Sequence, residues 1–234
     1  MRYPALSPIL RAAAILNLAC LLGCEAGPAA TRPPSPPASQ WEDAIRAFEE
    51  ADRKSPPPAD AILFIGSSSI RLWNLKDYFP DLQVINRGFG GSYISDSVEF
   101  LSRIAIPYKP RIVVLYAADN DIKDGKLPDV LLADFKAFAA LLEERLPAAR
   151  LVFISIKPSP ARWQLFERMK EANEKIRAFI ATDPRLIYVD VVPPMLGADG
   201  KPRPELFVED QLHLSPSGYR LWASLLRGAL EASR

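Results

Sequence analysis

The sequence contains one histidine and two cysteines among its 234 residues. With so few of these ligands, and with both cysteines close to the N-terminus, the usual zinc sites cannot be assembled. The acidic residues between positions 119 and 124 do not have the spacing of a calcium-binding loop either. Basic residues are not in excess, because 29 Lys and Arg stand against 28 Asp and Glu, and they form no stripe. We therefore expect no metal, no other cofactor and no nucleic-acid partner.

Long hydrophobic runs are missing as well. The N-terminal apolar run, Ala12–Leu22, has 11 residues, which is too short to span a bilayer but suits the core of a signal peptide. Arg2 and Arg11 precede this run, and Cys24 follows it in the sequence LLGC. The pattern resembles a bacterial lipoprotein signal, which implies cleavage of residues 1–23, lipidation of Cys24 and a lipid-anchored, periplasm-facing protein of the cell envelope. A plain secretory signal with a chance cysteine is the alternative.

A proline-rich segment separates this signal from the part of the chain that can fold. Residues 24–40 are rich in Pro, Ala and Ser and contain almost nothing to bury, so they predict an extended tether. Glu25, beside the expected anchor, resembles a signal for sorting to the outer membrane. Apolar residues then recur at helical spacing from Trp41 to Arg53. We expect one folded domain over residues 41–234 that begins with this helix.

Short apolar runs alternate with amphipathic stretches from residue 61 onwards. The runs predict strands and the stretches between them predict helices. Short strands that are apolar on both faces are typical of a parallel sheet covered by helices on each side. We therefore expect an α/β fold of three layers around a five-stranded parallel sheet. The expected strands cover residues 61–65, 82–85, 111–116, 150–154 and 186–191, and the expected helices cover residues 95–104, 128–146, 163–181 and 215–232.

Polar segments follow several of these strands, at the edge of the sheet where such folds bind ligands. They read GSSS at 66–69, NRGFGG at 86–91, AADND at 117–121 and DQLHL at 210–214. Taken singly, each has an ordinary interpretation as a helix cap, a tight turn or a surface loop. Together they supply a nucleophile, a base with an orienting carboxylate, and donors for an oxyanion, which acyl transfer requires. A single helical turn would place Asp210 and His213 on one face.

These four segments resemble the conserved blocks of the SGNH (GDSL-type) hydrolases, and the resemblance extends from about residue 61 to 219. It implies a flavodoxin-like fold and a serine esterase that needs no cofactor. It also implies that Ser68 is the nucleophile, that His213 acts as base and then as acid, and that Asp210 orients the imidazole. The N–H groups of Ser68 and Gly91, with the side-chain amide of Asn120, would then hold the oxyanion.

Three residues depart from the pattern of that family. Ser67 replaces the usual Asp of the first block, Ala118 replaces the usual Gly of the third, and Ser92 stands where many members have Asp. None of these changes removes a group that would handle the proton or the oxyanion. They leave the subfamily, and therefore the substrate, open.

Several cations follow the expected strands and are candidates for binding the substrate. An arginine can bind a carboxylate or a phosphate with two parallel hydrogen bonds, so such cations would favour an acidic substrate. The alternative is that they are solvated, or that they pair with Asp119, Asp121 and Asp124. The four candidates are Arg71, Arg87, Lys157 and Arg162.

The resemblance leaves several activities open. The first expectation is an envelope esterase that removes O-acetyl groups from carbohydrates or cleaves short-chain esters. Hydrolysis of lysophospholipids or thioesters is an alternative, as is acyl transfer to an alcohol other than water. A protein that uses the same pocket only to bind glycans or lipids is the alternative from a different class. The expected partners are therefore a small-molecule, glycan or lipid ester and, through the anchor, a membrane.

Overall fold

The computed structural model describes residues 38–231, which contain the expected five-stranded sheet. The strand order is β2-β1-β3-β4-β5, and every neighbouring pair is parallel. The predicted α/β fold is therefore confirmed. The expected signal peptide, Cys24 and the tether up to residue 37 lie outside the described residues. The strands are β1 (Ile62–Gly66), β2 (Val84–Gly88), β3 (Ile112–Tyr116), β4 (Arg150–Ile154) and β5 (Leu186–Val189).

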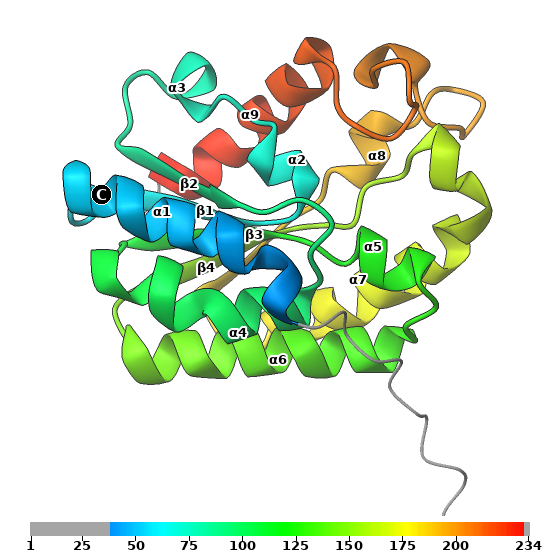
Figure 1. Ribbon diagram of the computed structural model, residues 1–234. Coiled ribbons are helices and arrows are strands. Elements are labelled where there is room, and N and C mark those ends of the chain that lie inside the picture. Colours follow the sequence, from blue (N-terminus) through cyan, green and yellow to red (C-terminus); the bar gives the residue numbers. More distant parts are fainter. Residues whose placement is uncertain (1–37, 232–234) are drawn as a thin grey trace, which may run out of the picture. The chain divides into compact units, whose positions relative to one another are not determined.

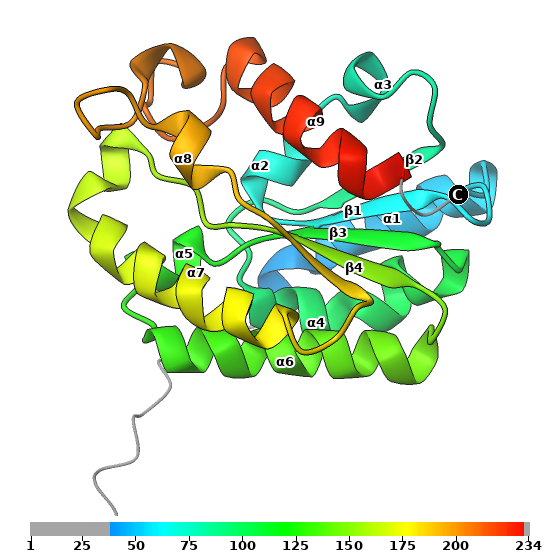
Figure 2. The same ribbon diagram turned by 180° about the vertical axis from the view of Figure 1, so that it is seen from behind.

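Helices cover both faces of this sheet, as the two opposite views in Figures 1 and 2 show. One layer contains α1, α4, α6 and α7, and the other contains α2, α3, α8 and α9. None of the described helices combines the length and the apolar character that crossing a membrane requires. The helices are α1 (Glu42–Lys54), α2 (Ser68–Arg71), α3 (Leu75–Tyr78), α4 (Ile94–Ile104), α5 (Asp119–Lys123), α6 (Pro128–Arg145), α7 (Phe166–Ile180), α8 (Val192–Met195) and α9 (Pro216–Glu231), with 3₁₀ turns at Ala38–Trp41, Ile106–Tyr108, Pro160–Leu165 and Pro204–Leu206.

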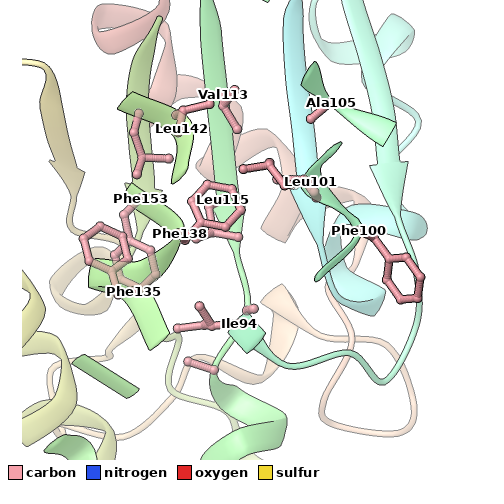
Figure 3. Packing of buried hydrophobic residues seen from close by; sticks show 14 of the residues in the cluster. Ile94, Phe100, Leu101, Ala105, Val113, Leu115, Phe135, Phe138, Leu142 and Phe153 are labelled. Carbon is pink, nitrogen blue, oxygen red and sulfur yellow. The ribbon is translucent and has the colours of Figure 1, made fainter. Parts of the chain in front are cut away.

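Alternate residues of each strand pack into two separate hydrophobic cores, because successive side chains of a strand point to opposite faces. In β1, Leu63 and Ile65 face the layer of α1, α4, α6 and α7, whereas Ile62 and Phe64 face the other layer. The buried face of α6 lies in the first of these cores, where Phe135 packs against Phe153 of β4 (Figure 3). Both cores reach the carboxyl ends of the strands, so the loops there start from rigid positions.

The second strand is the element whose predicted position was least accurate. It begins at Val84 and continues to Gly88, whereas the apolar run predicted residues 82–85. The run stops early because Asn86 and Arg87 are polar, yet both are satisfied within the fold. The Asn86 amide donates to the carbonyls of Ile70 and Trp73 at 2.7 and 3.0 Å. Hydrogen bonds of this kind allow polar residues to occupy a buried strand.

The N-terminal helix α1 is held to the rest of the domain by ion pairs. Arg103 of α4 binds Glu42 at 2.8 Å and Glu49 at 2.8 Å, both on α1. Asp52, near the end of α1, lies 2.5 Å from the guanidinium of Arg87. Bidentate arginine–carboxylate contacts give geometric specificity as well as attraction. Helix α1 is therefore fixed in direction along the edge of the sheet that β2 forms.

Candidate active site

Ser68 lies at the first position of α2, directly beyond the carboxyl end of β1. The turn that places it there requires glycine at position 66, because a Cβ on Gly66 would lie 1.8 Å from the carbonyl oxygen of Tyr116. Gly66 also has a φ of +136°, which L side chains rarely adopt. The chain therefore leaves the strand abruptly. The Ser68 hydroxyl lies within hydrogen-bonding distance of the His213 ring, with Oγ and Nε2 separated by 2.9 Å.

The other ring nitrogen of His213 is bound to Asp210, with Nδ1 and Oδ2 2.5 Å apart. The predicted helical turn is wrong, because residues 210–213 form an irregular loop in which Gln211 has a φ of +57°. The carboxylate itself organises this loop, since Oδ1 accepts the N–H groups of Leu212 and His213, both at 2.9 Å. One oxygen of Asp210 thus fixes the backbone while the other binds the imidazole.

The carboxyl group of Asp210 is strongly acidic in this loop. Partial burial opposes its ionisation, but the hydrogen bonds from the His213 ring and from two backbone N–H groups outweigh burial and lower its pKa to about 2. Asp210 therefore carries a full negative charge at neutral pH. Such a charge holds the Nδ1–H tautomer of the ring and leaves Nε2 free to accept a proton from the serine hydroxyl.

Three hydrogen-bond donors lie on the segments that follow the neighbouring strands β1, β2 and β3. The backbone N–H groups of Ser68 and Gly91 have no hydrogen-bond partner among residues 38–231. Gly91 follows β2, is exposed and has a φ of +82°. The side chain of Asn120, at the start of α5, donates from Nδ2 to the carbonyl of Ser92 at 3.3 Å. An amide nitrogen has two hydrogens, so Asn120 keeps one donor beyond that bond.

Arg162 determines which way the Asn120 amide points. Its Nη2 donates to Asn120 Oδ1 at 3.0 Å, and its Nη1 lies 3.2 Å from Asp119 Oδ2. Because a guanidinium only donates, it must face the oxygen of the amide and leave the nitrogen on the other side. Asp119 is buried, which raises its pKa, but the charges of Lys157 and Arg162 outweigh burial and lower it. A buried ion network therefore fixes the Asn120 donor.

The structure corrects most of the predicted substrate-binding cations. The buried guanidinium of Arg87 pairs with Asp52, and the buried ammonium of Lys157 lies 3.0 Å from Asp119, so neither is available to a substrate. Arg162 is engaged with Asn120. The pairing of Arg87 and Lys157 follows from the cost of burying an unpaired charge, which makes interior cations pair with carboxylates. Arg71 alone is exposed, and it borders an open cavity of about 610 Å³ between α1 and the α2–α3 segment.

Known proteins resemble this chain in sequence and in fold. A model of the GDSL-like Lipase/Acylhydrolase family matches residues 72–221. The chain belongs to this family. It is therefore an acylhydrolase, an enzyme that hydrolyses ester bonds. The match begins four residues after Ser68, so the first of the four segments precedes it.

Individual relatives extend the comparison. The chain is 29% identical over 180 residues to the platelet-activating factor acetylhydrolase IB subunit alpha1 of Homo sapiens, a match that covers 72% of this chain and 74% of that protein. Its fold is similar to a GDSL-like lipase from Bacteroides thetaiotaomicron, with a TM-score of 0.71, 19% identity and coverage of 81% and 98%. A carbohydrate esterase family 3 protein from Talaromyces cellulolyticus gives a TM-score of 0.57 at 13% identity, with coverage of 72% and 95%.

The three departures from the acylhydrolase pattern have distinct structural settings. The hydroxyls of Ser67 and Ser92 are buried, and neither has a hydrogen-bond partner in the described part of the chain. Ala118 adopts a φ of +87°, the left-handed region that favours the glycine usual in the family. The backbone conformation before Asn120 is therefore kept although the residue type is not.

A second buried ion network, which the sequence did not indicate, includes Asp121, the residue that follows Asn120. Lys126 is 1% exposed and lies 2.7 Å from Asp121 and 3.3 Å from Asp134. Burial raises the pKa of Asp121 to about 7, against the opposing charge of Lys126. Spacing along the chain gives no signal for such a cluster, because α5, the following loop and α6 each contribute one member. The described residues hold no group of His, Cys, Asp and Glu arranged for a metal ion.

Proposed function

We propose that this acylhydrolase works through a covalent acyl-enzyme on Ser68. The observation that carries the proposal is the chain of contacts from Ser68 Oγ to His213 Nε2 at 2.9 Å and from His213 Nδ1 to Asp210 at 2.5 Å. A nucleophile, a base and a group that orients the base are the parts that serine-based acyl transfer needs. Ser68 and His213, which are in contact in the structure, are 145 positions apart in the sequence.

In the first half of the reaction, Ser68 Oγ attacks the ester carbonyl carbon and His213 Nε2 takes its proton. The carbonyl electron pair moves onto oxygen, and this oxyanion is bound by the N–H groups of Ser68 and Gly91 and by the Asn120 amide. When the tetrahedral intermediate collapses, the bond to the alcohol breaks and His213 returns its proton to the leaving oxygen. Ser68 then carries the acyl group.

In the second half, a water molecule takes the place of the alcohol. His213 accepts a proton from the water as its oxygen attacks the acyl carbon, and the same donors bind the second oxyanion. Collapse breaks the bond to Ser68 Oγ, which recovers the proton from His213, and the carboxylic acid is released. Because the base must be unprotonated, we expect kcat/KM to fall as the solution is acidified.

We propose a short acyl group as the part of the substrate that is removed. The names of two relatives support this: one is an acetylhydrolase and the other a carbohydrate esterase. Arg87, Lys157 and Arg162 are paired with carboxylates of the protein, which does not favour an acidic substrate. An O-acetylated carbohydrate or another neutral short-chain ester therefore fits best. Hydrolysis of lysophospholipids or thioesters would appear as a higher kcat/KM for those substrates, and acyl transfer would appear as a new ester when another alcohol is added. The family assignment sets aside the non-catalytic alternative.

The proposal is tested with the purified full-length chain and p-nitrophenyl acetate. We expect hydrolysis by the wild type and none above background by Ser68→Ala, whereas Ser69→Ala, a matched change at the neighbouring serine, should keep most of the activity. Hydrolysis that survives Ser68→Ala would refute the proposal. Acetylated glycans, lysophospholipids and acyl thioesters, compared by kcat/KM, then rank the substrates, and added alcohols reveal acyl transfer.

We also propose that Cys24 carries a lipid and anchors the enzyme in the cell envelope. The support is the sequence alone: the short apolar run, the LLGC motif and the proline-rich segment that follows. Labelled palmitate should enter the wild-type protein but not Cys24→Ser in a bacterial host that processes lipoproteins. Equal labelling of both proteins would refute the anchor.

A further inference from the structure

We propose that Trp41 is a positioning residue that orients the Gly91 N–H, one of the oxyanion donors of the function proposed above. Trp41 precedes α1 and lies outside the segment that matches the family. Its indole Nε1–H donates a hydrogen bond of 2.9 Å to the carbonyl oxygen of Gly90. The start of α1, dark blue in Figure 1, lies beside the loop between β2 and α4.

Trp41 and the Gly91 N–H are linked through a single peptide unit. The Gly90 carbonyl and the Gly91 N–H belong to the same peptide group, which is planar and trans, so the two bonds point in opposite directions. A donor that holds the oxygen therefore sets the direction of the hydrogen. A hydrogen bond to the oxygen also polarises the peptide group and makes its N–H a stronger donor. Trp41 acts on Gly91 through both effects.

This peptide needs such a restraint because glycine lies on each side of it. Gly91 has a φ of +82°, and a Cβ placed there would meet nothing within 4 Å, whereas a Cβ on Gly90 would lie 2.8 Å from Nε of Arg71. Neither glycine has a side chain of its own that limits rotation of the peptide. Glycine reaches both signs of φ with little steric cost. The Gly91 N–H has no partner in residues 38–231 that would hold it. The bond from Trp41 is therefore the contact that fixes this peptide plane.

Trp41 is itself held firmly. Its side chain is 6% exposed, and its ring packs edge-on against Phe89 with centroids 5.9 Å apart. A buried indole that is packed against Phe89 loses little freedom when it forms this bond, so the orientation that it imposes is well defined.

The test compares two changes in the purified full-length enzyme. Trp41→Phe keeps an aromatic ring against Phe89 but removes the donor. We expect kcat to fall about 10- to 100-fold with KM unchanged, since complete loss of an oxyanion donor costs about 10²- to 10³-fold and a loosened donor costs less. The inhibition constant of an aryl trifluoromethyl ketone, whose tetrahedral adduct places an oxyanion in the same hole, should rise by the same factor.

Arg103→Gln is the control for loosening α1. It weakens the ion pairs of the helix and leaves the indole in place, so the melting temperature should fall while kcat stays within about twofold of the wild type. Should Trp41→Phe fold poorly, the isosteric β-(3-benzothienyl)alanine at position 41 removes only the N–H. Wild-type kcat in the folded Trp41 variants would refute the inference, and so would an equal loss of kcat in Arg103→Gln. Neither result would contradict the proposed acyl-enzyme on Ser68, which Ser68→Ala tests separately.

Discussion

The two sides of the active site hold their functional groups by opposite means. On one side, Asp210 is half exposed and holds His213 through short-range contacts within a single loop. On the other, Asn120 is carried by α5 between two buried ion networks, one around Asp119 and one around Lys126. The carboxyl groups reflect the contrast: hydrogen bonds lower the pKa of Asp210 to about 2, whereas burial raises that of Asp121 to about 7.

This difference indicates what each side must do. In the proposed mechanism the imidazole changes its protonation state, and a solvated loop with an ionised carboxylate allows that change at low cost. The amide of Asn120, as a proposed oxyanion donor, has to keep its orientation, because such a donor is effective only if it needs no reorganisation during the reaction. A buried ionic frame supplies that rigidity.

The largest effect is expected from Asp210→Asn. The asparagine oxygen can keep the backbone bonds to Leu212 and His213, so its NH₂ group then faces Nδ1 of the ring. That arrangement favours the tautomer with hydrogen on Nε2, which cannot accept the proton of Ser68. We expect kcat to fall about 10³-fold or more, by analogy with the same change in other serine hydrolases. Steady-state kinetics measures it, and a loss below tenfold would show that the loop is dispensable for tautomer control.

On the opposite side, Asn120→Ala should lower kcat by about 10²- to 10³-fold through loss of one oxyanion donor. Arg162→Lys keeps a positive charge beside Asp119 but loses the planar fork that also reaches Asn120. We expect it to lower kcat about tenfold, because a misdirected donor keeps part of its effect. KM should be unchanged in both variants. A rise in KM with unchanged kcat would instead assign Arg162 to substrate binding.

The two carboxyl groups should affect stability in different pH ranges. Asp121 is protonated in the folded protein up to about pH 7 but ionises near pH 4 when unfolded, so its contribution to stability is lost as the pH rises between these values. The contribution of ionised Asp210 is lost as the pH falls from about 4 to 2. Melting temperatures measured against pH should therefore change slope in the upper range for Asp121→Asn and in the lower range for Asp210→Asn. Coincident curves would contradict the contrast.

The smallest effect concerns Ala118, whose left-handed conformation precedes Asn120. Ala118→Gly should raise the free energy of unfolding by about 1 kcal/mol, since relief of the backbone strain exceeds the extra entropy of glycine in the unfolded chain. Urea denaturation measures this change. A decrease in stability would show that the buried methyl group of Ala118 contributes more than the strain costs.

Much of the fold could be predicted because short apolar runs and helical periodicity are local properties of the sequence. The main errors occurred where polar side chains are satisfied by distant partners. The prediction ended strand β2 before Asn86, because the sequence does not show that the Asn86 amide donates to carbonyls of another segment. Arg87 and Lys157 were expected at the substrate because their carboxylate partners lie 35 and 38 positions away in the chain. No local pattern distinguishes a paired cation from a free one.

The sequence by itself determined the strands and helices, and the order of the segments that carry Ser68, Gly91, Asn120 and His213, because hydrophobic periodicity and turn residues act over a few positions. Tertiary structure decided which of those groups meet and how the Asn120 amide is turned. It also decided that the indole of Trp41, which precedes the matched segment, donates a hydrogen bond to the carbonyl oxygen of Gly90. These features depend on distances and directions between residues far apart in the chain, and only the packing of both helical layers on one sheet sets them.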